Sequence, residues 1–186
     1  MRHANVKAIV AMAMVVALGC GLVACSEQDV IGLVESGVSA AQVALPVIVG
    51  ATDLTPAQKA TLLGDLQGAV NGLNGVAQAI ETGGSAQTVA AAITGALTSV
   101  VAQNAVIQAQ LSASLPAPVL AAFNAVAAVV ETILNNFGQK AAQKAGVTLL
   151  RVHYSTRQLA RLEKARSAAV ALTVQIALEQ AKAGGK

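Results

Sequence analysis

Apolar residues recur at alternating steps of three and four along four segments of this 186-residue chain. Because an α-helix has about 3.6 residues per turn, this spacing places the apolar side chains on one stripe of a helix. The stripes cover residues 31–48, 62–80, 86–111 and 120–137. Short connections containing Gly, Pro and Ser separate them and favour antiparallel neighbours, so the sequence predicts an all-α, antiparallel bundle of four to five helices.

Signals at the helix ends support these boundaries. In a capping box, a Ser or Thr and a Gln three residues later cap each other's backbone. Two runs match: Thr55-Pro56-Ala57-Gln58 and Ser155-Thr156-Arg157-Gln158. The second run predicts a fifth, basic helix over about 156–183, and the β-branched run 147–154 before it is interpreted as an ordered connection or a helical extension. Pro46 is expected to bend or end the first helix, and Gly138 to stop the fourth.

The composition favours helices held together by packing. Alanine is abundant, the aromatic residues are two Phe and one Tyr, and no sustained alternation of apolar and polar residues predicts strands. We expect the stripes to bury Leu66, Leu73, Leu97, Phe123 and Val130.

Two features within the stripes have both a structural and a functional interpretation. Gly64, Gly68 and Gly72 share one helix face, an arrangement that allows close helix contact in soluble bundles and in membrane helices. Tight packing within a soluble bundle is the favoured interpretation. Asn104 lies in an apolar stripe, where a buried amide can fix helix register or oligomeric state; the alternative is that it turns to the rim of the bundle.

The amino-terminal residues have the pattern of an export signal. A basic head with Arg2 and Lys7 precedes a 17-residue uncharged apolar run, 8–24, which ends in small residues. The same run is long enough to remain as a short transmembrane anchor. Its short length and the presence of Gly19 and Gly21 favour cleavage.

The cleavage motif is Leu22-Val23-Ala24-Cys25. It resembles the lipobox of bacterial lipoprotein precursors. The resemblance covers the targeting segment only and implies that residues 1–24 are a signal peptide and that Cys25 becomes the acylated amino terminus, with palmitate a typical chain. The remaining residues, 25–186, are enough for a single domain with a sizeable core. A second candidate ends in Cys20, but it has Ala17 where the lipobox normally has leucine, so Cys25 is the better acylation site. Ser26 after the cysteine implies an outer-membrane location, facing the periplasm, in a bacterium with two membranes.

Charge is divided unevenly along the exported part. Residues 26–138 carry a net charge of −6, and residues 139–186 carry +7. Arg157, Arg161 and Lys164 fall on adjacent turns of one helix face and are a candidate contact for an anionic membrane or envelope polymer. A solvated helix face, or pairing with the acidic part of the chain, is the alternative.

Residues 82–130 contain no charged side chain. This length accommodates a helical hairpin, so a membrane-active protein that inserts the hairpin into a bilayer is the alternative function. Insertion would place several Gln and Asn side chains in hydrocarbon, which is costly unless they are paired. A soluble bundle with a neutral polar face explains the segment at lower cost.

Motifs for catalysis are absent from the sequence. It contains no HExxH, Walker loop or G-x-S-x-G, and signal cleavage would leave His153 as the single histidine. An enzyme, a cofactor and a metal site are therefore not expected, and nucleic acid is not an expected partner of an exported chain. We expect a lipid-anchored cell-envelope lipoprotein that acts as a structural or binding module, through helix-face contacts with a protein partner or with itself.

Overall fold

The computed structural model describes residues 30–82, 86–111, 113–135 and 154–184. These residues form five helices and no strand: α2 (Val30–Gly50), α3 (Pro56–Glu81), α4 (Ala86–Leu111), α5 (Ala117–Ile133) and α7 (Thr156–Gly184). The prediction of an all-α bundle is confirmed. The interpretations of the signal peptide, of 147–153 and of Gly138 lie outside the described residues.

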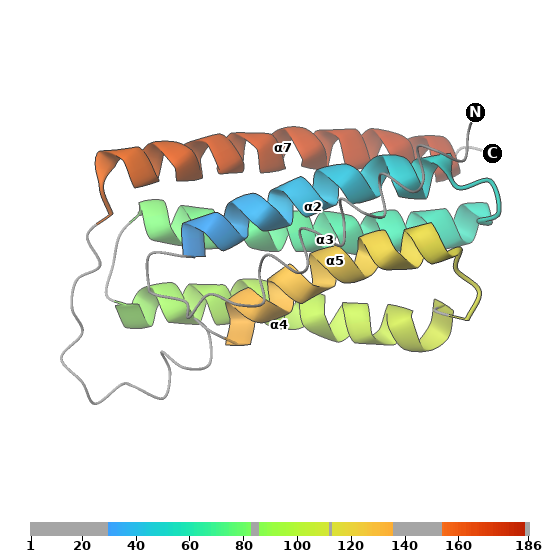
Figure 1. Ribbon diagram of the computed structural model, residues 1–186, viewed down its shortest axis with the longest axis horizontal. Coiled ribbons are helices and arrows are strands. Elements are labelled where there is room, and N and C mark those ends of the chain that lie inside the picture. The colour runs from blue at the N-terminus through green and yellow to red at the C-terminus, as the bar shows by residue number, and fades with distance from the viewer. Residues whose placement is uncertain (1–29, 83–85, 112, 136–153, 185–186) are drawn as a thin grey trace.

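Helix α3 is the central element of the bundle. It packs against each of the other four helices, and most extensively against α7 and α4. Helix α2 contacts α5, α3 and α7, while α4 contacts α3 and α5. In Figure 1, α7 lies along one side of the molecule and α4 along the opposite side, with α2, α3 and α5 between them. Helix α7 therefore has one long face that no described helix covers.

Both predicted capping boxes are formed. Thr55 Oγ1 accepts a hydrogen bond from the backbone N–H of Gln58 at 3.2 Å, and Gln58 Oε1 accepts from the N–H of Thr55 at 2.9 Å. At the start of α7, Ser155 and Gln158 make the same reciprocal pair at 3.2 and 2.8 Å. These bonds satisfy amide groups that the first turn of a helix leaves without partners.

Pro46 does not end the first helix, which contradicts one of the two expected outcomes. Helix α2 continues through Pro46 to Gly50. A proline ring has no N–H to donate to the carbonyl four residues earlier, that of Gln42. Both residues are exposed, so water can reach this carbonyl, and the turn after Pro46 is held by the buried side chain of Ile48 and by Lys59 Nζ, which donates to the carbonyl of Val49 at 2.9 Å.

The stripes form a continuous core. All five residues predicted to be buried are buried, and Phe123, the largest of them, is 3% exposed.

Close packing of α3 on α4 depends on Gly72, because a Cβ atom there would lie 2.7 Å from Leu97 Cδ2 and 3.1 Å from the carbonyl of Ala96. At Gly64 the nearest such atom is 3.7 Å away, in Gln180 of α7. The three glycines therefore do not all face the same helix: Gly64 faces α7, whereas Gly72 faces α4.

Candidate functional site

A groove with a volume of about 600 Å³ lies between the second half of α2 and the first turns of α5. This volume falls within the range of about 300–1,000 Å³ that is typical of ligand sites. The turn from α2 to α3 closes one end of the groove. The lining is mostly apolar and small: Gln42, Val43, Pro46, Val47, Gly50, Ala51, Thr52, Asp53, Pro116, Pro118, Val119, Ala121 and Ala122.

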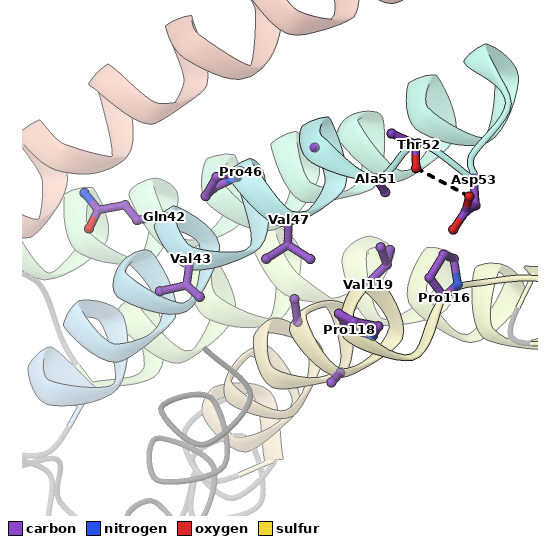
Figure 2. Close-up of a pocket in the computed structure, with 13 residues that line it drawn as sticks. Gln42, Val43, Pro46, Val47, Ala51, Thr52, Asp53, Pro116, Pro118 and Val119 are labelled. Atoms are coloured by element: carbon purple, nitrogen blue, oxygen red, sulfur yellow. Dashed lines mark hydrogen bonds between the residues drawn. The ribbon is translucent and has the colours of Figure 1, made fainter. Parts of the chain in front are cut away.

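The apolar side chains of the groove face one another across it. Figure 2 shows Val43 and Val47 pointing from α2 toward α5, where Pro118 and Val119 lie opposite. Polar groups stand at its two ends: Gln42 at one, and Thr52 and Asp53 at the other, where Thr52 Oγ1 donates to Asp53 Oδ1 at 3.4 Å. An apolar floor with a few polar groups at the rim suits an apolar or amphipathic ligand.

A second hollow of about 490 Å³ lies on the other side of α2, against α7. Gln42 and Pro46 line both hollows, so the Pro46 ring stands between them. The Gln42 carbonyl, which receives no hydrogen bond from Pro46, can thus accept one from a ligand on this part of α2. In the sequence, a proline inside an apolar stripe was the one sign of this feature. Whether it leads to hollows beside α2 depends on how far α5 and α7 lie from that helix, which the sequence does not show.

A buried polar pair lies in the interface between α3 and α4. Asp65 is 5% exposed and Asn104 is 2% exposed. With its amide nitrogen turned toward the carboxylate, Asn104 donates to Asp65 Oδ1 at 3.1 Å and also to Oδ2. Burial raises the pKa of Asp65 to about 7. Of the two alternatives for Asn104, the structure shows the buried one, whereas no role was predicted for Asp65 from the sequence.

The three residues predicted to contact anions have different surroundings. The Arg161 guanidinium forms an ion pair with Glu35 of α2, with Nε donating to Glu35 Oε1 at 3.0 Å, and this contact raises the pKa of Arg161. Arg157 and Lys164 are exposed and have no ion pair within the described residues. Arg166 pairs with Glu81 of α3. Part of the basic helix therefore contacts the acidic part of the chain.

Helix α2 is the one helix in the described residues that is long and apolar enough to cross a membrane by length and composition alone. In its most apolar stretch, 56% of the residues are buried inside the fold. An apolar helix near the amino terminus is compatible with a signal or a membrane segment, and equally with a core helix of the bundle. Leu22, Val23, Ala24 and Cys25 lie outside the described residues.

Within the described part of the chain, no group of three or more His, Cys, Asp or Glu side chains is placed to hold a metal ion. Comparison of the chain with family models, with curated proteins and with solved structures finds no match.

Proposed function

We propose that this protein is a lipid-anchored lipoprotein of the bacterial cell envelope whose helical domain is a binding module. The run from Leu22 to Cys25 supports the anchor, by its resemblance to a lipobox. The apolar groove between α2 and α5 supports the binding role, since the partly exposed side chains of Val43 and Val47 that line it cost free energy while they face water.

The occupant that best fits the groove is the apolar face of a helical segment from a protein partner. The α2 wall from Gln42 to Gly50 is about 12 Å long at about 1.5 Å per residue, or roughly two helical turns. Two turns present apolar residues at steps of three and four, which is the usual way a helix fills a groove. The Gln42 carbonyl and side chain provide polar contacts at the rim.

The binding role can be tested by photo-crosslinking in intact cells. A photoreactive residue at Ala121, in the groove, should give a discrete protein adduct, whereas the same residue at Ala128, exposed on α5 outside the groove, should not. Val47→Gln should reduce the Ala121 adduct, and the crosslinked peptide should carry apolar residues at helical spacing. Equal adducts from both positions, or none from Ala121, would contradict the proposal.

The anchor is tested separately by labelling cells with a fatty-acid analogue. Wild type and Cys20→Ser should be labelled, whereas Cys25→Ser should remain an unlabelled precursor. Equal labelling of wild type and Cys25→Ser would contradict the anchor. Fractionation then tests the outer-membrane location that Ser26 implies.

A further inference from the structure

Helix α7 has a buried apolar stripe and, on the nearly opposite face, an exposed stripe that is apolar in its second half. The inner stripe is buried against α3 and α2: Leu162, Ala165, Ala169, Leu172 and Ile176. The outer stripe also follows steps of three and four, and every member is exposed: Ala160, Glu163, Ser167, Val170, Val174, Ala177 and Ala181. Glu163 and Ser167 interrupt its first half, and it is apolar from Val170 onward. A helix that only covers the bundle needs the inner stripe alone.

The outer face of α7 exposes more large apolar side chains than the described remainder of the surface. Val170, Val174 and Leu178 are 50, 57 and 58% exposed, and Leu159 is 37% exposed. Leu178 lies at the edge of this face and also lines the hollow between α7 and α2. Elsewhere in the described residues one large apolar side chain, Val106 of α4, is comparably exposed. Single exposed apolar residues are ordinary, but several on one helix face indicate an interaction surface.

Positive charges border this face. Arg157, Lys164 and Lys182 share one flank, because they lie about two and five helical turns apart. Lys182 pairs with Glu179 on α7 itself, which leaves Arg157 and Lys164 exposed without an ion pair in the described residues. Arg161, Arg166 and Lys182 are in ion pairs, so the charges of α7 outside these pairs are Arg157 and Lys164 against Glu163. The balance is positive, which favours an anionic partner over a second copy of this face.

We propose that the outer face of α7 lies flat on an anionic lipid bilayer, with Val170, Val174 and Leu178 entering the interface and Arg157 and Lys164 contacting lipid phosphates. An apolar face bordered by basic residues is the pattern of helices that lie in a membrane interface. A helix of 29 residues provides a contact about 43 Å long. The geometry rests on the proposed function, since an anchor at Cys25 holds the domain at the membrane.

The experiment measures the depth of one fluorophore in vesicles that contain nitroxide-labelled lipid. The full chain carries Cys20→Ser and Cys25→Ser, so the apolar segment 8–24 retains it on the vesicle and the result does not depend on acylation. A single probe is attached after Ala177→Cys on α7 or, as a matched control, after Val106→Cys on α4. Figure 1 shows that these helices lie on opposite sides of the bundle.

In vesicles containing phosphatidylglycerol, the probe at 177 should be quenched several-fold more strongly than the probe at 106. Arg157→Gln with Lys164→Gln should weaken docking by about fivefold per charge removed, the factor expected for a basic residue at an anionic surface. Val170→Gln with Val174→Gln should also weaken it. Salt at about 1 M, which shortens the screening length to about 3 Å, should reduce the difference between the probes.

Two outcomes would overturn the proposal. Equal quenching at 177 and 106 would show that α7 does not face the bilayer. If the labelled Ala177→Cys chain were not quenched by lipid and the unlabelled chain formed disulfide-linked dimers, a second copy of the chain would be the partner. Neither outcome bears on the acylation of Cys25, which the fatty-acid labelling tests independently.

Discussion

Asp65 of α3 and Asn104 of α4 face each other inside the bundle, where each is the hydrogen-bonding partner of the other. When Asp65 is ionised, the Asn104 amide nitrogen donates to the carboxylate. When Asp65 is protonated, its O–H can donate to the Asn104 carbonyl after the amide turns over. The pair can thus be satisfied in both protonation states, but the ionised state carries a charge that burial disfavours.

The pKa of Asp65 predicts how stability depends on pH. Its folded value of about 7 lies above the ordinary 3.8, so the folded state binds more protons between these values. The contribution of Asp65 to the free energy of unfolding should therefore be largest below about pH 4, fall as pH rises toward 7, and level off above it. At about 1.4 kcal/mol per pKa unit, the change attributable to Asp65 is about 4 kcal/mol at most.

Asp65→Asn is the matched variant for this prediction, because it keeps the shape of the side chain and removes the charge. Denaturant unfolding at a series of pH values should show that the variant is more stable than wild type at pH 8 and that the two converge near pH 4. Parallel pH profiles for the two proteins would mean that Asp65 is solvated in the folded state.

Asn104→Leu should destabilise the protein by about 1–3 kcal/mol at pH 8, because it leaves the Asp65 carboxylate buried without its amide partner. Adding Asp65→Leu should recover much of this loss, since replacing both partners by apolar groups removes the cost of desolvation. A double-mutant cycle measures this coupling. Strictly additive effects would show that the two side chains do not interact.

Gly72→Ala and Gly64→Ala should change stability in opposite directions. At Gly72 the added methyl group would contact Leu97 and the Ala96 carbonyl, so α3 and α4 must separate, at a cost of about 1–3 kcal/mol. At Gly64 the methyl group has room, and the higher helix propensity of Ala should stabilise the protein by up to about 1 kcal/mol. Thermal unfolding of the pair tests the close packing; a stabilising Gly72→Ala would contradict it.

The helices and their core were predictable because both depend on local patterns. The capping boxes at Thr55 and Ser155 and the apolar stripes are properties of adjacent residues, and the structure retains them. Pro46 was harder to interpret, because whether a helix continues past a proline depends on tertiary contacts such as Lys59 to Val49. The groove and the Asp65–Asn104 pair depend on which helices become neighbours. An apolar stripe shows which face of a helix is buried, but not which helix covers that face.

Arg161 of the basic helix α7 pairs with Glu35 inside the protein, whereas Arg157 and Lys164 of the same helix are exposed. Substitutions can separate the internal contact from the exposed charges. The Arg161 and Glu35 side chains are partly exposed, 52% and 32%, so the ion pair should contribute no more than about 1 kcal/mol to stability. Arg161→Gln, Glu35→Gln and the double variant should reveal this coupling by denaturant unfolding, with a smaller value in high salt. Arg157→Gln with Lys164→Gln is the control, and should leave the unfolding midpoint nearly unchanged because neither residue pairs with another charge in the described residues. If the control pair destabilised the fold as much as Arg161→Gln does, its charges would act within the protein and would not be available for a partner.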